Sequence, residues 1–224
     1  MIRIDIVSDT VCPWCFIGKR RLEAALEQHG DSEPVTIVWR PYQLNPDMPE
    51  GGLDRRQYLE AKFGGPEGAK EVYDRIRGAG RSAGLDLNFE AIPRTPNTVN
   101  SHRLIHRATT LGKQDEIVEA LFRAYFLEGR DIGSIDTLVD CAASVGLPEA
   151  EIRDYLESDE DAELIRGFDA QARTMGIQGV PCFIFNNKYA VSGAQEPATF
   201  LKVFAILKEE AAKAAADSEG TPSD

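Results

Sequence analysis

The chain has 224 residues, of which 42% are hydrophobic and 28% are charged. This length allows one large domain, or a domain with an insertion, to bury a core without metal or disulfide staples. The 25 basic and 37 acidic residues give a formal net charge of −12. Because phosphate groups are bound by clustered Lys and Arg, nucleic acid and anionic membrane surfaces are poor partners for such a chain.

The N-terminus and the cysteine content indicate a cytoplasmic protein. The chain enters an apolar strand pattern at once, without the basic region and apolar core of a secretion signal. It has no run of about 18 apolar residues that could cross a bilayer. Four cysteines are too few for a secreted disulfide scaffold. We therefore expect any paired cysteines to be reactive ones.

The first 50 residues predict a strand, a helix and a second strand. Residues 2–8 alternate and are rich in isoleucine, an amphipathic helix follows to about Gln28, and residues 35–39 form another apolar run. This βαβ order favours a parallel pair of strands.

The middle of the chain, from about residue 53 to residue 174, shows no convincing strand. Gly, Pro or capping residues separate its helical segments. These segments are expected near 54–63, 67–83, 97–111, 114–127, 134–145, 149–156 and 160–175.

Beyond Gly176 the pattern returns to strands. Residues 179–185 and 188–192 flank an Asn186-Asn187 turn, which predicts an antiparallel hairpin, and a last amphipathic helix is expected over 196–210. From about Ala211 the composition predicts a disordered tail. The whole order predicts one small mixed sheet, built from both chain ends around an inserted helical subdomain.

The most informative motif is Cys12-Pro13-Trp14-Cys15. Proline suits the first helical position, so Cys12 is expected at the N-cap of the first helix. There its sulfur faces free backbone N–H groups and the positive end of the helix dipole, and both favour a thiolate. Cys15, one turn later, could then attack a mixed disulfide on Cys12 and release the substrate. The motif therefore predicts dithiol–disulfide exchange.

Two other interpretations of the pair stay open. A structural zinc site needs four ligands, whereas Cys141 and Cys182 are solitary and the three histidines are scattered. The pair could also be two inert thiols at a helix start. Of the other cysteines, Cys141 is expected in the core, and Cys182 is either buried filler or a third redox partner.

The second element is Val180-Pro181, at the entry to a late strand, where proline cannot donate to a ladder. A βαβ unit with C-x-x-C at its first helix, followed late by Val-Pro and a ββα unit, resembles the thioredoxin fold. With its helical insertion, the chain further resembles the DsbA-like proteins, and among them the cytoplasmic FrnE-like branch. The stretches that carry this resemblance are Ser8 to Gly18, Arg40 to Pro46, Asn97 to Leu104, Gly176 to Pro181 and Gly193 to Gln195.

The resemblance implies an α/β thioredoxin-like fold interrupted by an all-helical subdomain. It divides the chain into a first thioredoxin part (1–52), the insertion (53–175), a second thioredoxin part (176–211) and a tail (212–224). It also implies that Cys12 is the attacking thiol, that Cys15 resolves the mixed disulfide, and that Pro181 is cis and holds the substrate cleft.

Several residues are candidate substrate contacts. The backbone of Val180 would pair with a substrate strand, and Pro13 and Trp14 lie beside the reactive sulfur, although Trp14 could be simple packing. Asn97 and His102 belong to a stretch that could line the cleft. Asn97 could equally be a helix cap. His102 shares a helix face with His106, a spacing that can bind metal, but without a third ligand ordinary histidines are expected.

The leading function is a thiol–disulfide oxidoreductase or isomerase acting on protein thiols and disulfides or on a small thiol. No bound cofactor is expected, and glutathione is a candidate redox partner. Relatives are often dimeric, so a homodimer is a candidate assembly. The alternatives are a glutathione-dependent isomerase or transferase, resembling the kappa-class glutathione transferases and 2-hydroxychromene-2-carboxylate isomerases, and a holdase without enzymatic activity. The kappa-like relatives usually carry serine where this chain has Cys12.

Overall fold

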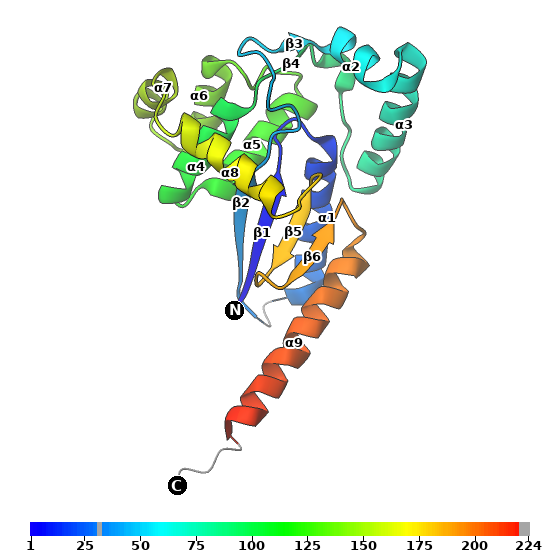
Figure 1. Ribbon diagram of the computed structural model, residues 1–224, viewed down its shortest axis with the longest axis vertical. Coiled ribbons are helices and arrows are strands. Elements are labelled where there is room, and N and C mark those ends of the chain that lie inside the picture. Colours follow the sequence, from blue (N-terminus) through cyan, green and yellow to red (C-terminus); the bar gives the residue numbers. More distant parts are fainter. Residues whose placement is uncertain (31–32, 220–224) are drawn as a thin grey trace.

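A computed structural model describes residues 1–30 and 33–219, and its central feature is a four-stranded sheet (Figure 1). The strands are β1 (Ile2–Ser8), β2 (Val35–Pro41), β5 (Cys182–Phe185) and β6 (Tyr189–Ser192). Their order is β2-β1-β5-β6, with β1 parallel to β2 and antiparallel to β5. The expectation of a mixed sheet built from both chain ends is confirmed.

The hairpin between β5 and β6 turns at Asn186 and Asn187, which have φ angles of 49° and 54°. Two successive residues with positive φ are what a two-residue hairpin turn requires, and asparagine tolerates this conformation better than most residues. The antiparallel hairpin predicted from the Asn-Asn pair is therefore confirmed.

Two helices, α1 (Pro13–His29) and α9 (Pro197–Glu219), pack together and contribute to the core beside the sheet. The alternating residues of β1 and β5 supply the sheet side of this core, because successive side chains of a strand point to opposite faces. The buried side chains include Ile2, Ile4, Ile6, Phe16, Ile17, Phe183, Phe185, Phe200 and Phe204.

The helical insertion lies at the end of the sheet where β1 and β2 finish (Figure 1). Its helices are α2 (Arg55–Phe63), α3 (Pro66–Ser82), α4 (Val99–Thr110), α5 (Gln114–Phe126), α6 (Ile135–Ser144), α7 (Glu149–Glu157) and α8 (Ala162–Thr174). The α2–α3 pair stands above the first turn of α1. The expected helical segments are confirmed, with shifts of two residues or fewer at their ends.

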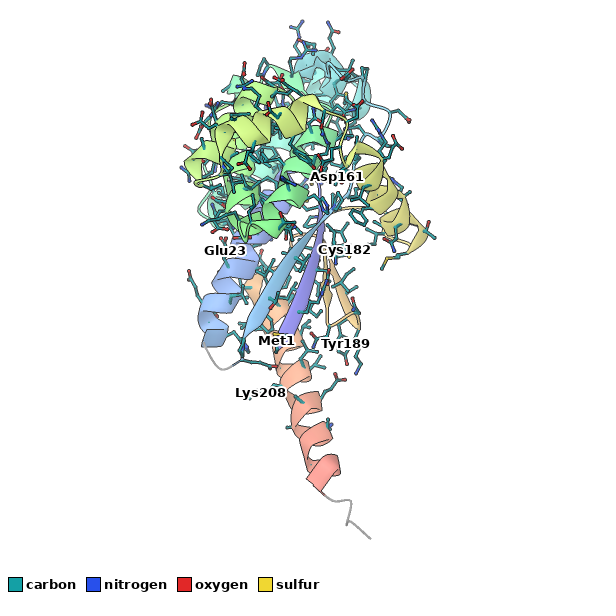
Figure 2. The ribbon with its side chains drawn as sticks, turned by 90° about the vertical axis from the view of Figure 1, so that its left-hand side faces the viewer. Met1, Glu23, Asp161, Cys182, Tyr189 and Lys208 are labelled. Carbon is teal, nitrogen blue, oxygen red and sulfur yellow. The ribbon has the colours of Figure 1, made fainter. Side chains whose placement is uncertain are left out.

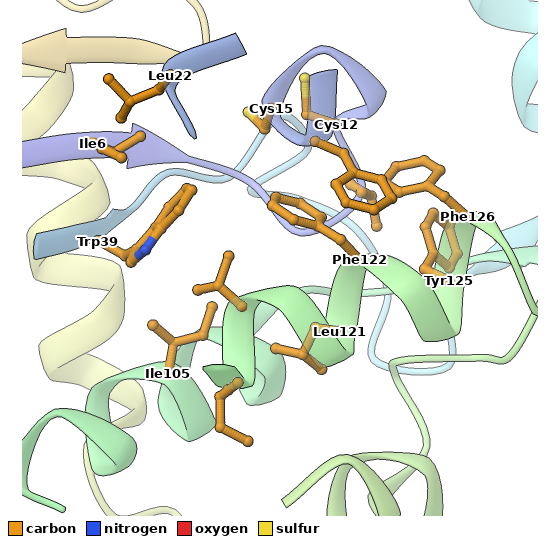
Figure 3. Packing of buried hydrophobic residues seen from close by; sticks show 14 of the residues in the cluster. Ile6, Cys12, Cys15, Leu22, Trp39, Ile105, Leu121, Phe122, Tyr125 and Phe126 are labelled. Atoms are coloured by element: carbon orange, nitrogen blue, oxygen red, sulfur yellow. The ribbon is translucent and has the colours of Figure 1, made fainter. Parts of the chain in front are cut away.

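Aromatic packing joins the insertion to the sheet (Figure 3). The ring of Phe122 in α5 stacks on Phe16 of α1 at 5.1 Å between centroids and meets the edge of Trp39 in β2 at 6.2 Å. The indole N–H of Trp39 donates to Asp115 of α5 at 2.9 Å. The insertion therefore shares one hydrophobic core with the thioredoxin-like part.

Two expectations were wrong. The middle region contains a short strand pair, β3 (Leu53–Asp54) with β4 (Arg94–Thr95), and two residues are too few to show an alternating pattern.

The tail predicted to be disordered over 212–224 is helical as far as Glu219, and residues 220–224 lie outside the described residues. Alanine is the best helix former, so an Ala-rich segment continues the packed helix. This end of α9 extends away from the body beyond Lys208 (Figure 2).

In the described part of the chain, no helix is both long enough and apolar enough to cross a membrane.

Gly18 lies at a close contact between α1 and the second half of the sheet. A Cβ atom at this buried position would lie 3.0 Å from the Pro181 ring and 3.0 Å from the Phe183 ring. We predict that Gly18→Val lowers the free energy of unfolding by about 1–3 kcal/mol, because extra methyl groups overpack a dense core.

Gly78 provides the matched control, since it is an exposed residue of α3 and a Cβ atom there would meet no other atom within 4 Å. Gly78→Val should change stability by less than about 0.5 kcal/mol. Urea unfolding of both variants measures the difference, and equal effects would contradict this account of Gly18.

Candidate active site

Cys12 stands where the sequence places it, at the N-cap of α1 (Figure 3). Its φ and ψ angles of −91° and 111° are extended, and Pro13 opens the helix. The Cys12 amide donates to the Asp9 carbonyl at 3.0 Å, and the Cys12 carbonyl accepts from the Cys15 amide at 3.0 Å. These bonds form a tight loop that presents both cysteines in the first turn. The cysteines are reduced in the structure.

Cys15 is the more deeply buried of the two thiols, at 1% exposure. Burial raises the pKa of Cys15 well above its ordinary value, and a hydrogen bond to Cys12 together with the charge of Cys12 raises it further. The Ser8 side chain and the Asp9 backbone act in the opposite direction. Cys15 is therefore held as a thiol that can donate a hydrogen bond to the sulfur of Cys12.

The Val180-Pro181 segment reaches the cysteines from the other end of the chain. The Cys12 thiol donates to the Val180 carbonyl at a sulfur–oxygen distance of 3.6 Å, and the Val180–Pro181 peptide bond is cis, as the resemblance implied. Pro181 itself is buried against Gly18 of α1. The fold thus brings together Cys12, Cys15, Val180 and Pro181, all of which the sequence had singled out.

A cavity of about 300 Å³ opens onto Cys12. Three further residues predicted from the sequence, Pro13, Trp14 and Val180, line it beside Cys12. The opposite walls come from the β2–α2 loop, from α2 and α3 and from β4. They are formed by Leu44, Asn45, Arg55, Tyr58, Leu59, Lys62, Phe63, Val72, Tyr73, Ile76 and Thr95.

The loop before Cys12 is anchored to the insertion through buried polar groups. The carboxylate of Asp9, which is 0% exposed, accepts from the Leu44 amide at 2.7 Å and lies 3.5 Å from Nε2 of His102. The hydroxyls of Thr10 and Ser101 share a hydrogen bond of 2.7 Å. The N-terminal half of α4 therefore packs against the loop that precedes Cys12 and helps to hold it in place.

This arrangement locates the Asn97 to Leu104 stretch, and neither Asn97 nor His102 lines the cavity over Cys12. His102 is 3% exposed, and its Nε2 also contacts the Tyr42 carbonyl at 3.1 Å. The Asn97 side chain accepts from the Val99 amide at 2.9 Å and donates to the Met48 carbonyl. The N-cap position of α4 considered for Asn97 is occupied by the next residue, Thr98. The structure places both residues in supporting positions.

Arg103, in the same stretch, closes the end of α7. Its guanidinium donates to the backbone carbonyls of Tyr155, Leu156, Ser158 and Glu160 at 2.6–3.2 Å. The last carbonyls of a helix have no partners within the helix, so this buried cation satisfies them. Arg103 therefore has a structural role in joining α4 to the end of α7.

The other two cysteines lie away from the pair. Cys182 packs with Val7, Tyr42 and Ala172 in a separate small cluster, and burial raises its pKa. Cys141 is buried in α6, and burial raises its pKa to about 11. Both positions agree with the interpretation of these cysteines as buried filler.

Within residues 1–30 and 33–219, no three His, Cys, Asp or Glu side chains gather in a way that could hold a metal ion.

The cavity residues of α2, α3 and β4 were not identified from the sequence. Arg55, Tyr58 and Lys62 follow Cys12 by more than 40 positions, and their spacing resembles any exposed helix. Asn45 belongs to the Arg40 to Pro46 stretch, which was singled out without a role. In the structure the Tyr58 hydroxyl donates to Asn45 Oδ1 at 2.5 Å, so this stretch positions one wall of the cavity.

Comparison with known proteins agrees with this geometry. The family described as "DSBA-like thioredoxin domain" matches residues 3–205. A probable DsbA oxidoreductase from Streptomyces coelicolor has 30% sequence identity, a TM-score of 0.82, and coverage of 100% of this chain and 93% of the other. The uncharacterized protein YwbO of Bacillus subtilis (strain 168) is 29% identical over 213 residues, covering 95% of this chain and 99% of YwbO.

A more distant structure shares the fold. The cytosolic disulfide reductase DsbM from Pseudomonas aeruginosa has 16% identity and a TM-score of 0.65, with coverage of 92% of this chain and 99% of DsbM. The family match spans nearly the whole chain and includes both cysteines and the Val180-Pro181 segment. The chain belongs to the DSBA-like thioredoxin family.

Proposed function

We propose that this protein is a thiol–disulfide oxidoreductase or isomerase that works through Cys12 and Cys15. The observation that carries the proposal is the arrangement of the two thiols, one at the N-cap of α1 facing a cavity and the other buried behind it. Free N–H groups and the helix dipole at this position stabilise a thiolate, which is the nucleophile in disulfide exchange.

In the proposed reaction, the Cys12 thiolate attacks one sulfur of a substrate disulfide. A mixed disulfide forms, and the other substrate sulfur leaves as a thiolate. Cys15 then loses its proton and attacks Cys12, which releases the second substrate thiolate and leaves a Cys12–Cys15 disulfide. The substrate gains two electrons, and the protein dithiol loses two. The reverse sequence oxidises a substrate dithiol.

Cys15 is suited to the resolving role because its raised pKa keeps it protonated while Cys12 reacts first. Only one of the two thiols then competes for the incoming substrate. The backbone carbonyl of half-buried Val180 and the apolar side chain of Trp14 flank the attacking sulfur. These groups offer a substrate a backbone partner and an apolar contact.

The finer expectations are proposals too. DsbM is a cytosolic disulfide reductase for which a structure with GSH exists, and this supports a cytoplasmic setting and glutathione as a redox partner here. The FrnE-like branch and the homodimer rest on the family resemblance alone and stay predictions.

The first prediction concerns the exchange activity. Cys12→Ser should lower insulin reduction and the reactivation of scrambled ribonuclease by about a hundredfold or more, because the nucleophile is lost. Cys15→Ser should instead accumulate a mixed disulfide with substrate on Cys12, detectable by mass spectrometry. Cys182→Ala serves as the control and should retain the activity, since Cys182 lies in a separate cluster.

Activity that survives Cys12→Ser would rule out this mechanism. If glutathione conjugation persists in that variant, the glutathione-dependent isomerase or transferase becomes the better assignment. If binding of unfolded protein persists without any exchange activity in the wild-type chain, the holdase becomes the better one.

A second prediction follows from the raised pKa of Cys15. The folded state keeps the Cys15 proton above pH 9, whereas the unfolded chain releases it, so stability present at neutral pH is lost as the pH rises. The free energy of unfolding should fall more steeply for the chain that keeps Cys15 than for Cys15→Ala, by up to about 1.4 kcal/mol per pH unit.

Urea unfolding under reducing conditions between pH 8 and pH 10.5 measures this difference. Cys12 interacts with Cys15 directly, so both chains also carry Cys12→Ala, and the contributions of Cys141, Cys182 and the buried phenols then cancel in the comparison. Parallel curves for the two proteins would show that Cys15 titrates as an ordinary thiol.

A further inference from the structure

The cavity over Cys12 carries the opposite charge to the rest of the chain. The chain has a net charge of −12, yet Arg55 and Lys62 line this cavity and no Asp or Glu does. Arg55 in particular needs a physical explanation, because it is buried and a buried charge is costly unless it is paired.

Arg55 is the more unusual of the two. It is 6% exposed and donates to the hydroxyls of Tyr125 and Tyr73, each at 2.8 Å. Burial raises the pKa of both phenols, so these partners are neutral and do not balance the guanidinium charge. Among the described residues, no carboxylate lies within ion-pair distance of Arg55.

The aromatic rings around Arg55 compensate for part of its desolvation. Its guanidinium carbon lies 5.4 Å from the Tyr73 ring centroid, 5.5 Å from that of Tyr125 and 5.9 Å from that of Phe89. Such contacts hold a cation in place. They leave donors unused, because only two of the five guanidinium N–H groups are needed for the hydrogen bonds to Tyr125 and Tyr73.

Two neighbouring groups in the cavity also have spare hydrogen-bonding capacity. The Thr95 hydroxyl is buried near the Tyr125 hydroxyl, without a hydrogen bond of its own within the usual distance. Lys62, which is exposed, donates to the Tyr58 hydroxyl at 2.7 Å. A ligand oxygen in this cavity would therefore meet a guanidinium, a hydroxyl and an ammonium group.

The size of the cavity limits the ligand. Cys12 is 3% exposed, so a substrate reaches it through this space of about 300 Å³, which is at the small end of ligand pockets. Most of the remaining wall is apolar, with Leu59, Phe63, Val72 and Ile76 facing the ligand space. The walls suit a short aliphatic chain that ends in an anionic group.

We propose that the cavity over Cys12 selects low-molecular-weight disulfides and thiols that carry a carboxylate, and that Arg55 binds this carboxylate with Lys62 assisting. The inference rests on the proposed function, since it names the substrate class of the same cysteine. The Cys12 thiolate forms a bond to the sulfur of the bound half, and the other half leaves as a thiolate. Cys15 then displaces the bound half as a second thiolate, and the protein dithiol supplies both electrons.

The test compares two disulfides of nearly equal shape, 3,3′-dithiodipropionate and its neutral diamide. Their rates of reduction by the reduced full-length protein are measured at pH 7.5 by quenching and mass spectrometry. We expect the wild-type chain to prefer the dicarboxylate over the diamide. Arg55→Gln should lower the dicarboxylate rate about tenfold or more, because a charge-assisted hydrogen bond is lost, and should change the diamide rate by less than about twofold. Arg55→Lys should restore part of the preference.

Arg56→Gln is the matched control. It removes the same charge at the next position of α2, but the Arg56 side chain is 84% exposed and does not line the cavity. Both rates should be unchanged in this variant. Lys62→Gln is a second test at an exposed position, where a folding defect is not expected, and it should lower the dicarboxylate rate two- to threefold.

Several outcomes would overturn the inference. These are equal wild-type rates for the two disulfides, an equal loss of both rates in Arg55→Gln, or an unchanged preference in Lys62→Gln. If Arg55→Gln slows insulin reduction as much as the dicarboxylate reaction, Arg55 serves peptide substrates or the structure instead. If Cys12→Ser reduces both disulfides at the wild-type rate, the proposed function itself is contradicted, because the reaction does not need Cys12. Reduction that depends on Cys12 but shows no charge preference contradicts only the substrate class.

Discussion

The buried carboxylate of Asp9 connects the three segments from which the active site is built. One oxygen accepts from the amide of Leu44 after β2, the other faces His102 of the insertion, and the Asp9 carbonyl accepts from the amide of Cys12. Oδ2 of this carboxylate has the Leu44 amide as its partner, whereas the buried Oδ1 lies 3.5 Å from His102 Nε2 and makes no hydrogen bond within the described residues. The position of Cys12 therefore depends on the docking of α4 and of the β2–α2 loop, and not on α1 alone.

The thioredoxin-like part and the helical insertion contribute different residues to the site. The thioredoxin-like part supplies the two cysteines and the Val180-Pro181 segment, and it sets which thiol is buried. The insertion supplies the walls that face Cys12, including every charged side chain of the cavity. The cysteines and the charged walls of the cavity thus come from different segments of the chain.

Much of the fold could be predicted from local patterns. The strand alternation in residues 2–8, the Asn186-Asn187 turn and the helical periods of the middle region indicated the elements that the structure contains. The prediction was wrong where the pattern was too short, as for the two-residue strands at Leu53 and Arg94. It was also wrong where composition was taken for disorder, since the alanines after residue 210 extend α9. In both cases the neighbouring structure decides the conformation.

By itself, the sequence determined the reactive motif, because Cys12, Pro13 and Cys15 are close along the chain and helix geometry alone brings them into one turn. It did not determine that Cys12 shares a cavity with Arg55, Tyr73 and Thr95, because local spacing does not encode such proximity. Only the tertiary structure decided that Asn97 and His102 lie outside the cavity, and that Cys182 belongs to another cluster. The reason is that burial and contacts between distant segments depend on how whole helices and strands pack. The residue pattern within one segment does not specify these contacts.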